Sequence, residues 1–273
     1  MIVVYLLNEE PLYVTMAFYS LNTLRKYNPN IPVRIYFVKD NCRDSRKVGN
    51  INEIGKRIGW IGQKKFFDFC KKNKIEVIFY NDLDLKEEKG YFSAQRIVFA
   101  DCLEENVLLM DSDTFIFGDI SCFFDIYKDY DFVATINDYG QFKDVTMNGV
   151  TFRPFNSGVV LWNNGWFKKY GEQIYDYCIG LKNKTHPLGE FCWSVSKECG
   201  GREEFACSLF VIENKLKFTY FDDLHVQRRN LNGNTRVLHT LTETWPNRYL
   251  TFQEELRKYL NKLKLPLKVI CKC

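Results

Sequence analysis

The sequence lacks several features that mark common protein classes. Its ten cysteines include no Cys-x-x-Cys pair, so a structural zinc site is not indicated. No apolar run reaches the roughly 18 residues of a membrane helix, and the strand-like start of the chain has no signal-peptide cleavage pattern. We therefore expect no membrane span. Free thiols without an export signal predict a cytoplasmic location.

A strong charge of one sign is also absent. The 38 basic and 34 acidic residues leave a net charge of +4, without a dense basic stripe, so nucleic acid is not an expected partner. No glycine-rich phosphate loop follows the first apolar run, which disfavours a nucleotidyltransferase that makes sugar nucleotides. Aromatic residues, in contrast, make up 16% of the chain. Their rings suit stacking on nucleobases and sugars.

The first half of the chain alternates between strand-like and helix-like segments. Continuous apolar runs, which are typical of buried parallel strands, lie at 2–7, 33–38, 75–80 and 107–110. Apolar residues at helical spacing predict helices between them, at 14–24, 48–58, 66–70 and 94–102. The predicted fold class is α/β, with a mostly parallel central sheet flanked by helices.

The second half is less regular. Predicted strands lie at 132–136, 158–162, 209–212, 218–221 and 236–239, and predicted helices at 167–181 and 250–263. No repeat or obvious linker divides the chain. We therefore predict one domain over residues 1–247, with halves at 1–110 and 111–247, followed by a C-terminal helix and tail at 248–273.

Asp111 and Asp113 stand one residue apart, directly after the predicted strand at 107–110. Two carboxylates so close repel each other. A divalent cation removes this conflict, because carboxylate oxygens suit Mg²⁺ or Mn²⁺. The carboxyl ends of strands in open α/β sheets are also where ligands bind. The pattern predicts a metal site for a phosphate-bearing ligand, although Asp-x-Asp also occurs in ordinary surface turns.

A longer series of motifs resembles a known family. The series is a strand ending in Asn8, Arg96-Ile97-Val98-Phe99, Leu109-Met110-Asp111-Ser112-Asp113, Phe155-Asn156-Ser157-Gly158-Val159-Val160-Leu161, and His239 ahead of Trp245-Pro246. It resembles the GT-A-fold glycosyltransferases, most closely the family-8 type. The resemblance covers residues 1–247 and implies a single Rossmann-like GT-A domain. It also implies transfer of a hexose or pentose from a nucleoside-diphosphate sugar, a UDP-sugar, to a hydroxyl of a glycan or glycoconjugate.

The resemblance implies roles for the matching residues. Asp113 would bind Mn²⁺ or Mg²⁺, Asp111 would contact the metal or the ribose, and His239 would be the third metal ligand. Gly158 would let the backbone approach a neighbour closely. The residues expected to bind the nucleotide or the sugar are Asn8, Arg96, Asp111, Ser112, Asn156 and Ser157.

Two further carboxylates are candidates for catalysis. Glu190 stands beside Phe191 and near Trp193, and burial among these rings would suit proton exchange with an acceptor hydroxyl. Asp138 follows another predicted strand and ranks below Glu190 as a base. Family-8 enzymes usually carry a glycine and a lysine after the late histidine, and the segment after His239 has neither. Inverting and retaining chemistry therefore both stay open.

Two alternatives come from other classes. Haloacid-dehalogenase-like, Mg²⁺-dependent phosphotransferases also place Asp-x-Asp after an apolar strand, and Asp222-Asp223 imitates their second acidic motif. In that class, however, the first aspartate usually lies near the start of the chain. A non-catalytic protein that binds sugars or nucleotides is the other alternative.

Overall fold

The described part of the chain is an α/β structure. The computed structural model describes residues 1–9, 11–39, 61–81, 106–136, 144–147, 149–187, 189–190, 202–222, 226–228 and 235–239. The strands are β1 (Ile2–Asn8), β2 (Val33–Lys39), β3 (Glu76–Asn81), β4 (Val107–Met110), β5 (Thr114–Ile116), β6 (Phe132–Ile136), β7 (Val145–Met147), β8 (Val150–Phe152), β9 (Phe155–Trp162), β10 (Phe218–Tyr220), β11 (Val226–Arg228) and β12 (Val237–His239). The helices are α1 (Pro11–Tyr27), α3 (Gln63–Lys72), α5 (Cys122–Ile126), α6 (Trp166–Lys182) and α8 (Arg202–Glu213).

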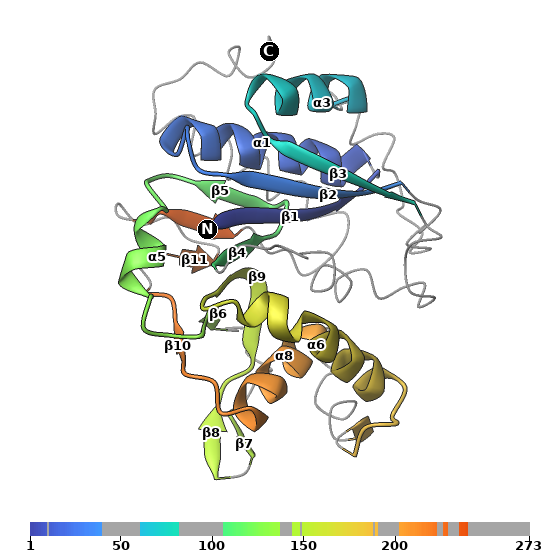
Figure 1. Cartoon of the computed structure of the whole chain (residues 1–273), viewed down its shortest axis with the longest axis vertical. Coiled ribbons are helices and arrows are strands. Elements are labelled where there is room, and N and C mark those ends of the chain that lie inside the picture. Colours follow the sequence, from blue (N-terminus) through green and yellow to red (C-terminus); the bar gives the residue numbers. More distant parts are fainter. Residues whose placement is uncertain are drawn as a thin grey trace.

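A seven-stranded sheet lies at the centre, in the order β10-β6-β9-β4-β1-β2-β3 (Figure 1). Its strands pair in parallel, except that β9 runs antiparallel to both β4 and β6. Because parallel neighbours end at the same edge, Asn8 at the end of β1 lies on the same edge as Asp111, which follows β4. The antiparallel β9 brings its first residues to this edge. The predicted fold class is confirmed.

Alternate strand residues fill two cores, one on each face of the sheet. Val3, Tyr5 and Leu7 of β1 pack in the core that α1 and α3 cover, whereas Ile2 and Val4 pack in the core that α6 and α8 cover. Figure 1 shows these two pairs of helices on opposite sides of the sheet. A strand buried on both faces needs apolar residues at every position, which explains why β1 and β4 are continuous apolar runs.

Most predicted elements are present, and one is wrong. The strands predicted in the first half correspond to β1, β2, β3 and β4, and the segment at 158–162 is the second part of β9. Residues 209–212, predicted as a strand, belong instead to helix α8. All four of them are buried. A short apolar run does not distinguish a buried strand from a buried stretch of helix.

Several predictions concern segments that the structure does not describe. The helices predicted at 48–58, 94–102 and 250–263 lie outside the described residues, and so do Arg96, Asp138 and the Trp245-Pro246 pair. The domain limits at residues 110 and 247 stay predictions.

A smaller three-stranded sheet, in the order β11-β12-β5, continues from the Asp-x-Asp segment. Strand β12 pairs antiparallel with β5, and in this register His239 lies opposite Thr114. The strand predicted at 236–239 is therefore present as β12. Its pairing with β5 brings His239 next to Asp113, although the two residues are far apart in the sequence.

Candidate functional site

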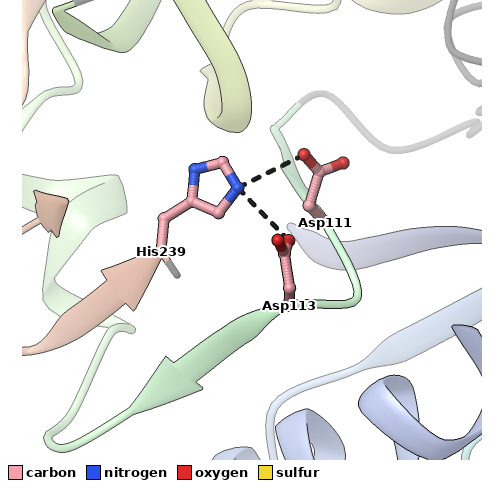
Figure 2. A group of neighbouring side chains, drawn as sticks. All are labelled: Asp111, Asp113 and His239. Atoms are coloured by element: carbon pink, nitrogen blue, oxygen red, sulfur yellow. Dashed lines mark ion pairs between the residues drawn. The ribbon is translucent and has the colours of Figure 1, made fainter. Parts of the chain in front are cut away.

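The side chains of Asp111, Asp113 and His239 meet at the carboxyl edge of the central sheet. Figure 2 shows the imidazole of His239, from β12, pointing toward the two carboxylates of the β4–β5 turn. Its Nε2 atom lies 3.2 Å from Oδ1 of Asp113 and 3.5 Å from Oδ2 of Asp111. The three potential ligand atoms lie within 4.8 Å of one another. The structure thus brings together the three residues predicted to hold a metal.

The site is buried on one side and open on the other. The side chains of His239 and Asp113 are 1% and 8% exposed, whereas that of Asp111 is 34% exposed. Burial alone would lower the pKa of His239, but the negative charges of Asp113 and Asp111 outweigh it and raise this pKa to about 9. Because Asp111 is the most exposed of the three side chains, we expect a ligand to approach the site from its side.

The Nε2 atom of His239 is buried and lies within ion-pair distance of both carboxylates, but among the described residues it makes no hydrogen bond of regular geometry. The two nearby carboxylate oxygens are acceptors only, and they also repel each other. A divalent cation between these three atoms would satisfy all of them, so the donor set fits a metal ion.

A chain of hydrogen-bonded hydroxyl groups supports the Asp-x-Asp turn. The Thr114 hydroxyl donates to the carbonyl of Asp111 (2.8 Å), so its oxygen accepts a hydrogen bond from Ser20 (2.9 Å). Ser20 in turn accepts from the Tyr5 hydroxyl (3.0 Å). Burial raises the pKa of Tyr5 to about 12, so this phenol keeps the proton that it donates. The chain fixes the turn to strand β1 and helix α1.

Strand β9 forms the other wall of the site. Its Gly158 carbonyl accepts a hydrogen bond from the Asp111 N–H (2.8 Å). The pairing of β6 with β9 shifts register between Ala134 and Thr135, and Thr135 pairs with Asn156. Such irregularities redirect side chains next to functional sites. Here the shift coincides with the Asn-Ser-Gly segment that lines the histidine.

Gly158 is required by the position of the His239 ring. A Cβ atom at residue 158 would lie 1.8 Å from Cε1 and 2.3 Å from Nδ1 of that ring. The sequence predicts a close approach to the backbone at this glycine, and the structure identifies the approaching group as the imidazole.

The Asn156 side chain connects β9 to the histidine. Its Oδ1 atom lies 3.1 Å from Nδ1 of His239, and its Nδ2 atom donates to Oε1 of Glu204, in α8, at 2.5 Å. Ser157 donates to the same Glu204 oxygen through its backbone N–H (3.1 Å) and its hydroxyl (3.4 Å). Asn156 is only 2% exposed. Its predicted contact with a sugar hydroxyl stays a prediction.

The other predicted site residues differ in placement. Ser112 is buried in the turn between the two aspartates, and Asn8 ends β1 opposite Val38. Glu190 is wrongly predicted to be buried: its side chain is 77% exposed and pairs with Lys184 at 3.0 Å. The structure places Glu190 after α6, where its exposed carboxylate lies beside Lys184. Phe191 and Trp193 lie outside the described residues.

Sequence reasoning missed Glu204. It lies 48 residues from Asn156, and no local motif connects them. The available signal is helical periodicity: on a helix, Glu204 falls on the same face as Cys207, Ser208 and Val211, which are all buried. A carboxylate on a buried, apolar face of a helix must have a hydrogen-bond donor or a cation beside it, because burial without one is costly. The strand predicted at 209–212 concealed this pattern.

The sequence profile of glycosyl transferase family 8 matches residues 2–187. The chain belongs to this family. It is therefore a glycosyltransferase, and the phosphotransferase and non-catalytic alternatives are set aside. The family match ends before Glu204 and His239, so what is said of these two residues rests on geometry.

Two solved structures resemble this family-8 glycosyltransferase over most of its length. The galactosyltransferase LgtC, crystallised with donor and acceptor sugar analogues, has a TM-score of 0.50 and 13% identity, covering 93% of this chain and 96% of LgtC. The apo form of the glycosyltransferase GlyE from Streptococcus pneumoniae TIGR4 has a TM-score of 0.54 and 15% identity, covering 96% of this chain and 63% of GlyE. At such identities the similarity shows the GT-A fold alone. A search of curated proteins found no match.

Among the described residues of this glycosyltransferase, no helix is both long and apolar enough to span a bilayer. A cytoplasmic location stays a prediction.

Proposed function

We propose that this family-8 enzyme binds a UDP-sugar through Mn²⁺ or Mg²⁺ and transfers a hexose or pentose to a hydroxyl of a glycan or glycoconjugate. The metal ligands are Asp111, Asp113 and His239. The observation that carries the proposal is the convergence of the buried His239 Nε2 atom and one carboxylate oxygen from each aspartate, all within 4.8 Å of one another.

The chemistry of the site supports a cation that also contacts phosphate. When bound, a divalent cation stabilises the negative charge that develops on the diphosphate leaving group. Asp113 and His239 hold the buried side of the site, and the half-exposed Asp111 borders the side open to a ligand. Three protein ligands leave coordination positions for phosphate oxygens.

The placement of the nucleotide follows from the sheet. Asn8 and the Asp-x-Asp turn lie on the same carboxyl edge, where ligands of open α/β sheets bind. We propose that Asn8, Ser112 and Asp111 contact the nucleoside, and that Arg96 and Ser157 contact the phosphate or sugar. In this proposal, residues 1–110 bind the nucleotide and residues 111–247 bind the metal, the donor sugar and the acceptor.

The direct test is calorimetric titration of the wild-type protein with UDP, GDP and a panel of nucleotide sugars, first with Mn²⁺ and then with excess chelator. We expect a uridine nucleotide to bind only when Mn²⁺ is present. Nucleotide binding that persists in chelator would contradict the metal ligands. If no nucleotide binds under any condition, the proposed donor class is wrong.

A second test concerns Glu190 and Asp138, the proposed catalytic carboxylates. Glu190→Gln should lower kcat much more than it weakens donor binding, because a base or a group beneath the anomeric carbon acts in the transition state. The matched control is Lys184→Met, which breaks the same exposed ion pair but keeps the carboxylate. Exposed pairs contribute only about 0–1 kcal/mol to stability, so both variants should fold normally. Equal kcat in the two variants would remove Glu190 from the catalytic residues.

A further inference from the structure

We propose that Glu204 is a positioning residue, which orients the Asn156 amide and thereby fixes the tautomer in which His239 presents Nε2 to the cation. The inference rests on the proposed metal-dependent function. It concerns the Glu204–Asn156 pair that supports His239, and not the metal-binding residue His239 itself. Outer partners of this kind fix the ring orientation and the tautomer of metal-binding histidines.

The contacts form a line from α8 to the metal site. Oε1 of Glu204 accepts from Asn156 Nδ2 (2.5 Å), and Asn156 Oδ1 lies 3.1 Å from His239 Nδ1. Glu204 is 9% exposed, Asn156 is 2% exposed and His239 is fully buried. Water therefore competes little for these groups, and each hydrogen bond is stronger than it would be at the surface.

The carboxylate determines which way the Asn156 amide faces. Ionised Glu204 is an acceptor only, so it requires the NH₂ group of the amide on its side. The Oδ1 atom is then directed toward two donors, the Gly158 N–H and the Thr135 hydroxyl, each at 3.2 Å. A flipped amide would set oxygen against the carboxylate and NH₂ against both donors. Only one orientation satisfies all of these groups.

The amide orientation in turn determines the tautomer of the histidine. Because Asn156 Oδ1 is an acceptor, the ring nitrogen facing it, Nδ1, must carry a proton. In the neutral ring this leaves the lone pair on Nε2, the atom that faces Asp111 and Asp113. The opposite tautomer would direct an N–H at the cation and could not bind it.

The test compares two substitutions of Glu204 that differ only in the acceptor. Glu204→Gln keeps an Oε1 atom for Asn156 and Ser157, whereas Glu204→Met keeps the length but offers no acceptor oxygen. With Mn²⁺ alone as the probe, Glu204→Met should weaken binding by about 10–100-fold, and Glu204→Gln by less than about threefold. Glu213→Met is the matched control, since Glu213 is on the same helix but bonds to Tyr177 at 2.5 Å. The control should leave Mn²⁺ affinity unchanged.

A double-mutant cycle separates this role from general support of the fold. If Glu204 acts through Asn156, then Glu204→Met should weaken Mn²⁺ binding by less than about threefold once Asn156→Ala is present. Equal losses in both backgrounds would overturn the proposal. The proposal would also be overturned if Glu204→Gln bound Mn²⁺ as weakly as Glu204→Met. The effect of Glu204 would then come from its charge and not from its hydrogen bond to Asn156.

A spectroscopic readout tests the inference without metal, at a pH above the His239 pKa of about 9, where the ring is neutral and carries one proton. The chain has three histidines, so ¹⁵N-histidine labelling with His186→Gln and His225→Gln variants identifies the His239 signals. We expect an exchange-protected Nδ1–H proton in the wild type and Glu204→Gln, lost or shifted in Glu204→Met. An unchanged signal in Glu204→Met would refute the proposal. Wild-type protein with this proton but no Mn²⁺ affinity would instead refute only the proposed function.

Discussion

Asp113→Asn is expected to abolish Mn²⁺-dependent UDP binding and sugar transfer while leaving the fold intact. Asp113 is the more buried of the two carboxylates and lies 3.2 Å from the His239 Nε2 atom. Asparagine preserves its shape but removes the charge that a hard cation requires. Loss of a direct ligand should exceed the roughly 10–100-fold effect of losing an outer partner.

The control for Asp113→Asn is Asp176→Asn, which removes one negative charge from the exposed surface of α6. Both variants should show cooperative thermal unfolding, and only the first should lose the calorimetric signal for UDP with Mn²⁺. Unchanged Mn²⁺-dependent UDP affinity in Asp113→Asn would refute the ligand set. A failure to unfold cooperatively would instead show that the carboxylate has a role in stability.

Gly158→Ala should have the largest effect of any single methyl addition in the site. The added Cβ would lie 1.8 Å from the His239 ring, which is fully buried. Gly158 is part of an extended strand, a conformation that alanine adopts readily, so the cost is steric rather than conformational. Overpacking of this kind costs roughly 1–3 kcal/mol. Displacement of the ring should also abolish Mn²⁺ binding.

Two comparisons make this result specific. Gly180→Ala, in α6, would bring its Cβ no closer than 3.5 Å to a neighbour and should be neutral or stabilising, because alanine favours helix. Removing the ring with His239→Ala should relieve most of the destabilisation caused by Gly158→Ala, and denaturant unfolding of the double variant measures this coupling. Additive losses of unfolding free energy would show that the ring is not the obstacle.

The part of the fold that depends on local patterns could be predicted from the sequence. Runs such as Ile2–Leu7 are apolar at every position because both faces of the central strands are buried. The Asp-x-Asp pair, the Asn-Ser-Gly segment and His239 were each visible as residue types at expected places. Their convergence at one edge is confirmed by the structure, and their roles in catalysis stay predictions.

The parts that could not be predicted depend on distant partners. The hairpin of β7 and β8, the strand β11 and the short helix α5 have weak local signals because each is only three to five residues long. Glu190 stands next to aromatic residues in the sequence, yet its carboxylate lies in solvent beside Lys184. Neighbours along the chain therefore do not establish burial. Glu204 requires knowledge of how α8 packs on β9, which one sequence does not contain.

The pairing of β12 with β5 has a consequence for the motions of this enzyme. His239 lies opposite Thr114 in that pairing, so the proposed third ligand is in place only while the two strands remain paired. Any brief opening of this short ladder would release the cation, and an occupied site would in turn suppress the opening, since the two equilibria are linked reciprocally. The Arg236 carbonyl accepts from the Phe117 N–H, so alternation along the ladder directs the Leu238 amide at β5. This amide hydrogen should therefore exchange with deuterium more slowly as Mn²⁺ is added, and ion release should occur at the rate at which the ladder opens.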